Sequence, residues 1–227
     1  MIGHPVSTFL PLNRSPCRLR VGAWSVDAVC AALSDRHESH SGLAARLAEE
    51  LVATGLDVPR DVVRVAGVPP SGRPVAMVHG EAVGISVSLS HVRGVVGAAA
   101  SAQASIGIDI VDPAETGRQL DAFFTPDELA LAPDEDGLLR GLLWSAKEAA
   151  YKAARLDVGF SPRAVAIESL AGNGFGWTVN GPHRLVSGAG GFAWAGRHIV
   201  AIAAAPLPTA GVRSGTRGTL VAPTPAA

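Results

Sequence analysis

The nine residues WSAKEAAYK, at 144–152, place three charged side chains inside a run of small and aromatic residues. On a helix, Trp144, Glu148 and Lys152 are spaced i, i+4 and i+8 and therefore share one stripe, with Lys147 one step round. Glu148 and Lys152 also form a common helical ion pair, which contributes roughly 0.2–0.5 kcal/mol on an exposed face. An exposed ion pair is therefore the alternative to a functional site.

A second carboxylate lies upstream, at Asp109 in the apolar run IGIDIVD. An aspartate inside an apolar strand either accepts hydrogen bonds from the backbone or an arginine, or binds a cation, because an unpartnered buried charge is costly. Asp109 and Glu148 together would hold one Mg²⁺, which proteins usually bind through one or two carboxylates and phosphate oxygens. Lys147 and Lys152 would then neutralise the phosphates. This combination predicts a metal–diphosphate site.

Two turns carry further polar side chains. Ser90 and His91 end a predicted strand, and Arg73 lies in the turn SGRP. A phosphate ligand is the functional interpretation of His91, and a capping or core histidine is the alternative. An isolated turn arginine is typical of a solvated side chain. The chain contains no GxxxxGK[ST], GxGxxG, GxSxG or HExxH, so the sequence gives no sign of the usual nucleotide loops, the hydrolase elbow or the zinc-protease motif.

Composition narrows the class of protein. The chain has 227 residues, 48% of them apolar, and a formal charge of −1 from 19 basic and 20 acidic residues. That balance gives no bulk attraction to nucleic acid or membranes. The two cysteines form no CxxC motif, and the N-terminus shows no charged segment followed by a long apolar run. We therefore expect a cytoplasmic protein without a signal peptide, a disulfide framework or a membrane span.

The hydrophobic pattern predicts an α+β protein with antiparallel sheets. Helices are expected at 24–33, 41–54, 126–132 and 138–156, and acidic residues at 134–136 separate the last two. The helix at 126–132 is expected to begin with a capping box formed by Thr125 and Glu128. Strands are expected at 61–66, 84–90, 95–100, 105–111, 164–168, 176–180, 191–194 and 198–204. These elements predict two halves of similar layout, at 1–104 and 105–206. The Pro-, Thr-, Gly- and Ala-rich segment 207–227 is expected to be a disordered tail.

Four motifs, in order along the chain, resemble those of the Sfp-type 4′-phosphopantetheinyl transferases. They are Gly72-Arg73-Pro74, then Ser88-Leu89-Ser90-His91 with Gly94, then Gly107-Ile108-Asp109, and then Trp144-Ser145-Ala146-Lys147-Glu148-Ala149-Ala150-Tyr151-Lys152. The last one fits the family pattern [FW]-[SCT]-x-K-E-[AS]-x-x-K at every fixed position. The specific pair is Gly107-Ile108-Asp109 and the nine-residue motif at 144–152, which lie some forty residues apart.

The resemblance implies a monomer of two similar α+β halves with coenzyme A in the cleft between them. It implies a transferase that moves the phosphopantetheine of coenzyme A to a serine of an acyl- or peptidyl-carrier protein and releases adenosine 3′,5′-bisphosphate. Polyketide, nonribosomal peptide or fatty-acid synthesis would supply the carrier. The surface around Phe123 and Phe124 is the expected place of carrier recognition.

The resemblance also implies residue roles. Asp109 and Glu148 would bind Mg²⁺, and Glu148 would accept the serine proton, directly or through water. Lys152 and His91 would contact phosphates with Ser90 beside them, and Arg73 would lie near the adenine or the 3′-phosphate.

One position departs from the family pattern. A second acid often follows the aspartate by two residues, whereas this chain has Val111 there and Asp112 next. Side chains alternate along a strand, so Asp112 is expected to face away from Asp109, and a water would replace the missing ligand. A non-catalytic module that binds coenzyme A or a carrier protein is the alternative function.

Overall fold

The computed structural model describes residues 8–33, 39–69, 71–131, 138–156 and 158–208. The acidic residues at 134–136 lie outside these ranges, as does the predicted tail beyond its first two residues.

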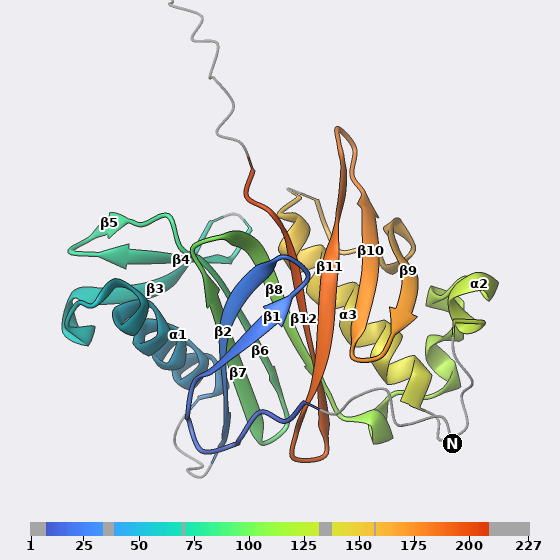
Figure 1. Cartoon of the computed structure of the whole chain (residues 1–227), viewed down its shortest axis with the longest axis horizontal. Coiled ribbons are helices and arrows are strands. Elements are labelled where there is room, and N and C mark those ends of the chain that lie inside the picture. Colours follow the sequence, from blue (N-terminus) through green and yellow to red (C-terminus); the bar gives the residue numbers. More distant parts are fainter. Residues whose placement is uncertain (1–7, 34–38, 70, 132–137, 157, 209–227) are drawn as a thin grey trace, which may run out of the picture.

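Two antiparallel sheets, each covered by one long helix, make up most of the fold (Figure 1). The four-stranded sheet has the order β1-β2-β7-β6, and the five-stranded sheet has the order β8-β12-β11-β10-β9. A small three-stranded sheet, β3-β4-β5, lies beside α1. The predicted α+β class is therefore confirmed.

The helices are α1 His40–Leu56, α2 Pro126–Leu129 and α3 Leu138–Ala154. The strands are β1 Cys17–Val21, β2 Trp24–Ala32, β3 Val63–Val68, β4 Arg73–Val78, β5 Glu81–Ala82, β6 Ser86–Val92, β7 Val95–Ser101, β8 Ala104–Val111, β9 Val165–Ala171, β10 Gly174–Asn180, β11 Leu185–Ala195 and β12 His198–Pro206. Four 3₁₀ turns are η1 Arg60–Val62, η2 Pro113–Glu115, η3 Arg118–Phe123 and η4 Pro162–Ala164.

Three buried clusters show how these elements stack. α1 packs on one face of the four-stranded sheet, and α3 packs on one face of the five-stranded sheet. The opposite faces of the two sheets meet in a third cluster, to which β8 contributes Ile106, Ile108 and Ile110. The helices therefore lie outside, and the sheets pack face to face between them.

The two sheets adjoin along one edge, where β6 and β8 lie side by side (Figure 1). There, serine hydroxyl oxygens of β6 accept hydrogen bonds from backbone N–H groups of β8. The pairs are Ser86 with Ile106 at 3.1 Å, Ser88 with Ile108 at 3.0 Å and Ser90 with Ile110 at 3.1 Å. We call these three pairs the serine ladder. It satisfies edge N–H groups that would otherwise lack partners.

β8 alternates between two environments, as a period-2 strand must. Its isoleucines face the other sheet, while Ser105, Gly107 and Asp109 face α3. The absence of a side chain at Gly107 lets the helix come close, because a Cβ there would lie 2.0 Å from the Ala149 carbonyl oxygen and 2.8 Å from the Lys152 Cβ. The glycine of the GID motif therefore sets the spacing between α3 and β8.

The helix predicted at 24–33 is wrong, since these residues form β2. Val26 and Cys30 face the core between the sheets, whereas Val29 and Ala31 face α1. Burial on both faces removes the apolar–polar alternation by which a half-buried strand is recognised. β1 does alternate, and the prediction omits it.

The other predicted helices and strands are confirmed within a few residues, except that α2 is shorter and β11 much longer than expected. The prediction also omits β4 and β5, and Arg73, expected in a turn, begins β4. The capping box that begins α2 is present, with Thr125 and Glu128 bonded reciprocally to each other's backbone N–H groups. No helix in the described ranges is long and apolar enough to span a bilayer.

We expect Gly107→Ala to destabilise the fold strongly, because the added Cβ meets helix backbone rather than a movable side chain. Overpacking that forces the backbone to shift typically costs about 1–3 kcal/mol, and we expect the upper end here because the added Cβ would lie 2.0 Å from the Ala149 carbonyl oxygen. Urea denaturation of the variant measures the loss.

Gly55→Ala is the matched control. An added Cβ at Gly55, inside α1, meets nothing within 4 Å, so this change should leave stability unchanged or raise it by up to about 1 kcal/mol. Equal stability of the two variants would contradict the close approach at Gly107.

Candidate functional site

The charged stripe of α3 meets Asp109 of β8. The Lys152 ammonium donates to Asp109 Oδ1 at 2.8 Å and to the Ile108 carbonyl oxygen at 3.0 Å. It also lies 3.9 Å from Glu148 Oε2. Lys152 therefore connects the two carboxylates that the sequence predicts to act together. Because Asp109 is buried, the alternative of an exposed surface ion pair does not account for the contact between Lys152 and Asp109.

This cluster has one more negative than positive charge. Burial raises the pKa of Glu148, the nearby Asp109 charge raises it further, and Lys152 acts in the opposite direction. Two carboxylates in a poorly hydrated place repel each other and favour a second cation between them. A divalent ion together with substrate phosphates would meet that need.

The neighbouring acid does not join the cluster. β8 ends at Val111, which packs in the α3 core, and Asp112 begins the turn η2 by accepting a hydrogen bond from the Ala114 N–H. Its other oxygen pairs with Arg197 at 2.5 Å. Asp112 thus faces away from Asp109, as predicted. In the described parts of the chain, no group of three His, Cys, Asp or Glu side chains could hold a metal. Asp109 and Glu148 fit Mg²⁺ as a pair completed by waters and phosphate.

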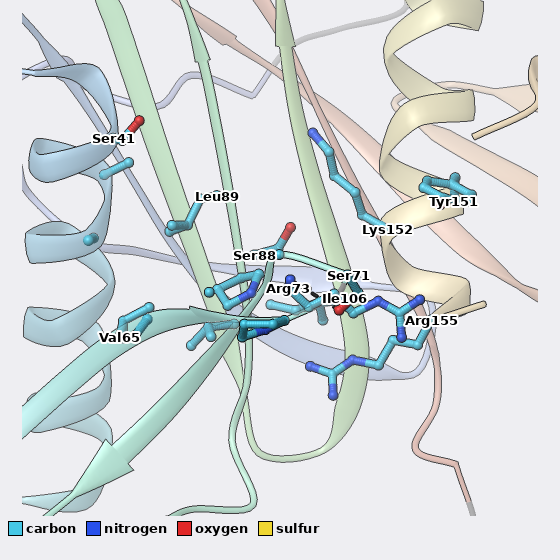
Figure 2. Close-up of a pocket in the computed structure, with 18 of the residues that line it drawn as sticks. Ser41, Val65, Ser71, Arg73, Ser88, Leu89, Ile106, Tyr151, Lys152 and Arg155 are labelled. Carbon is cyan, nitrogen blue, oxygen red and sulfur yellow. Dashed lines mark hydrogen bonds between the residues drawn. The ribbon is translucent and has the colours of Figure 1, made fainter. Parts of the chain in front are cut away.

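A cavity of about 1150 Å³ lies between α1 and α3, above the edge where β6 and β8 adjoin. The β3–β4 segment forms another wall, with the turn that contains Ser71 and Gly72. Figure 2 shows Lys152 reaching from α3 toward the strands on one side and Ser41 of α1 on the other. Lys152 lines the cavity. Asp109 and Glu148 are not among the lining residues, but each forms an ion pair with the Lys152 ammonium.

Two arginines gather at the other end of this cavity (Figure 2). Arg73 comes from β4 and donates to the Leu156 carbonyl oxygen. Arg155 follows α3 and donates to Ser86 Oγ at 3.0 Å. Burial lowers the pKa of Arg155, and the Arg73 charge lowers it further. Two like charges facing one cavity favour an anionic ligand.

His91 also lines the cavity, at the end of β6. Its ring lies 5.3 Å from the ring of His40, the first residue of α1. The pKa of His91 is lowered by burial and by the neighbouring His40 and Lys152, and Asp109 opposes the shift. At neutral pH His91 is therefore a neutral hydrogen-bonding group at the cavity wall rather than a fourth fixed cation beside Lys152, Arg73 and Arg155.

Ser90 does not line the cavity, although the residues on either side of it do. Its side chain is buried, and its hydroxyl donates to Asp109 Oδ1 at 2.9 Å while accepting the N–H of Ile110. The sequence resemblance places Ser90 beside the residues that would contact phosphates; in the structure its hydroxyl contacts Asp109 instead, and Ser90 does not reach the cavity.

Lys147 is separated from the site although it adjoins Glu148 in sequence. Its side chain is 1% exposed and its ammonium lies 2.6 Å from Glu128 Oε1, with further bonds to the carbonyl oxygens of Pro162 and Val165. The step of 100° per residue round a helix carries it to the core face of α3. This corrects the prediction that Lys147 neutralises a phosphate.

Two residues of importance are missing from the sequence interpretation. Arg155 is three residues past Lys152, so the i+3 spacing could have placed it on the same side of the helix. Glu128 was predicted as a capping residue only; its second oxygen also holds Lys147 and the Ile167 N–H. Nothing local to Glu128 indicates that second role.

The two phenylalanines expected at the carrier-binding surface differ in exposure. Phe124 is buried, and its ring lies 5.9 Å from the Lys147 ammonium. Phe123 is 37% exposed and packs against Trp144, which in turn contacts Phe160. Only Phe123 of the predicted pair is therefore available to a partner.

Comparison with known families agrees with this site. Residues 105–202 match the model of the 4′-phosphopantetheinyl transferase superfamily. The match begins in β8, ends in β12 and includes Asp109, Glu148 and Lys152. It supports the superfamily for this part of the chain, while the narrower Sfp type stays a prediction. None of the curated proteins compared with the chain matches it.

We expect Lys147→Met to lower the stability of the folded protein. Removing one partner of a buried ion pair leaves an uncompensated charge, here on Glu128, and costs about 3–5 kcal/mol. Arg18→Met is the control, because the Arg18–Asp27 pair is exposed and such pairs contribute at most about 1 kcal/mol. Chemical denaturation compares the two variants. A Lys147→Met protein with wild-type stability and no activity would instead indicate that Lys147 acts in the active site.

Proposed function

We propose that the protein is a Mg²⁺-dependent transferase that moves the 4′-phosphopantetheine group of coenzyme A to a serine of a carrier protein. The observation that carries the proposal is the pair of carboxylates, Asp109 and Glu148, joined by Lys152 at one end of a cavity whose other end holds Arg73 and Arg155. The superfamily match over residues 105–202, which include both carboxylates, Lys152 and Arg155 but not Arg73, supports it. The Sfp-type assignment belongs to this proposal.

The reaction forms a bond between the serine oxygen and the β-phosphorus of coenzyme A and breaks the bond from that phosphorus to the bridging oxygen. Adenosine 3′,5′-bisphosphate leaves with the electron pair of the broken bond. The serine proton passes to the Glu148 carboxylate, directly or through a water. Burial and the Asp109 charge raise the pKa of Glu148, which makes it a better proton acceptor than an exposed glutamate.

Asp109 and Glu148 would hold Mg²⁺, which would supply electrostatic stabilisation of the charge that develops on the phosphoryl oxygens. Lys152 contributes a second positive charge to the same oxygens, because its ammonium lines the cavity beside both carboxylates. His91 donates or accepts one hydrogen bond at the wall. Fixed charges of this kind stabilise the transition state without reorganising.

Arg73 and Arg155 would bind the phosphate at the adenosine end of coenzyme A. Arginine forms paired, charge-assisted hydrogen bonds to phosphate oxygens. The apolar cavity wall between the two charged ends includes Val65, Val87 and Leu89, and would cover the base. An acyl- or peptidyl-carrier protein would approach near Phe123, and polyketide, nonribosomal peptide or fatty-acid synthesis would use the product. We expect the enzyme to work as a cytoplasmic monomer.

The first test is incubation of the protein with coenzyme A, Mg²⁺ and an apo carrier protein, followed by intact-mass spectrometry of the carrier. We expect the mass to increase by one phosphopantetheine, and EDTA to prevent it. Glu148→Gln and Asp109→Asn should each lower turnover by about 100-fold or more with the fold retained, because each removes a group that acts on the reacting atoms.

Glu50→Gln is the matched control, since Glu50 is an exposed carboxylate on α1; it should keep wild-type turnover. Ordinary activity of Glu148→Gln would overturn the role given to that residue. Coenzyme A binding without modification of fatty-acid, polyketide or peptidyl carriers would instead identify a non-catalytic binding module.

A second prediction concerns the arginine end. Arg155→Ala should weaken binding of adenosine 3′,5′-bisphosphate by about 10- to 100-fold, because a hydrogen bond to a charged group contributes about 1.5–3 kcal/mol. Arg20→Ala removes the same charge from an exposed position on β1 and should leave the affinity unchanged. Calorimetric titration of each variant measures the difference. Equal affinities of the wild type and Arg155→Ala would place the bisphosphate elsewhere.

A further inference from the structure

The three hydroxyls of the serine ladder have the same backbone role but different second partners. Ser86 Oγ also accepts from Arg155 at 3.0 Å, and Ser90 Oγ donates to Asp109 Oδ1 at 2.9 Å. In the described part of the chain, Ser88 Oγ shows only its bond from the Ile108 N–H. Only Ser90 therefore connects the ladder to a carboxylate of the site.

The bonding of Ser90 fixes the direction of its single proton. A hydroxyl has one proton to donate and two lone pairs. The N–H of Ile110 occupies a lone pair of Ser90 at 3.1 Å, and the proton points to Asp109 Oδ1. Ile110 follows Asp109 directly in β8. The carboxylate is thus held relative to the backbone of its own strand, across the boundary between the two sheets.

Both donors to Asp109 use the same oxygen. Ser90 and Lys152 each donate to Oδ1, at 2.9 and 2.8 Å. Within the described ranges, no donor contacts Oδ2. A carboxylate with one oxygen held by neighbours and the other open has the arrangement that a metal ligand needs, because the holding bonds set its orientation before the ion arrives.

We propose that Ser90 is a positioning residue for the divalent cation: it holds Asp109 by Oδ1 so that Oδ2 is presented to Mg²⁺. This proposal rests on the proposed function, from which it takes the ion. It gives Ser90 a specific role, whereas the sequence resemblance only places it beside the residues that would contact phosphates. It also makes a residue of the four-stranded sheet necessary for a metal site whose ligands lie in β8 and α3.

The test is calorimetric titration of Mg²⁺ into protein saturated with adenosine 3′,5′-bisphosphate, with thermal denaturation alongside. Ser90→Ala should weaken Mg²⁺ binding by about tenfold or more, the usual result of removing a partner that orients a metal ligand. Ser88→Ala removes an equivalent ladder hydroxyl that does not contact a carboxylate, and should bind Mg²⁺ like the wild type. Both variants should lose a similar few degrees of Tm, about 2–4 °C.

Ser90→Cys covers the case in which Ser90→Ala folds poorly, because a thiol keeps nearly the same volume and is a weak donor. It should also bind Mg²⁺ about tenfold more weakly. Wild-type Mg²⁺ affinity in a folded Ser90 variant would overturn the positioning role alone, and an equal loss of Mg²⁺ affinity in Ser88→Ala would overturn it too. A wild-type protein that neither binds Mg²⁺ nor modifies a carrier would overturn the proposed function together with this inference.

Discussion

The close packing of α3 on β8 is the constraint on which the site depends. It requires a residue without a Cβ at Gly107, where the helix backbone at Ala149 leaves no space for one. Two residues farther along β8 and about one turn farther along α3, this contact brings Lys152 to Asp109. At a greater helix–strand distance, Glu148 and Lys152 would form an ordinary surface pair. The same packing buries Glu148 enough to raise its pKa.

The site draws on both sheets, although its acids come from one of them. Asp109, Glu148 and Lys152 belong to β8 and α3, whereas Arg73 and His91 belong to β4 and β6. The serine ladder joins β6 to β8, and so connects the two larger sheets, with hydrogen bonds in which serine hydroxyls take the place of the backbone groups of a neighbouring strand. Charge is therefore organised locally, with acids at one end of the cavity and arginines at the other, in a chain whose formal charge is only −1.

Much of this organisation could be predicted from local pattern. The period of α3, the capping box at Thr125 and the strand around Asp109 are set by residues within one or two turns of each other, so their signals are readable in the sequence. The opposite orientation of Asp112 also follows from the alternation of a strand. The prediction failed at β2, where burial on both faces hides that alternation.

The sequence by itself determined most of the elements, the two acids and Lys152, and a resemblance to the transferases. Only the tertiary structure decided the partners of individual side chains. It turned Lys147 into the core against Glu128, directed Ser90 to Asp109, and brought Arg155 beside Arg73. The physical reason is that periodicity and propensity depend on near neighbours, whereas the partner of a charge depends on which distant elements pack against it. Ser90 and Asp109 lie 19 residues apart, and Arg73 lies 83 residues from Leu156, whose carbonyl oxygen it contacts.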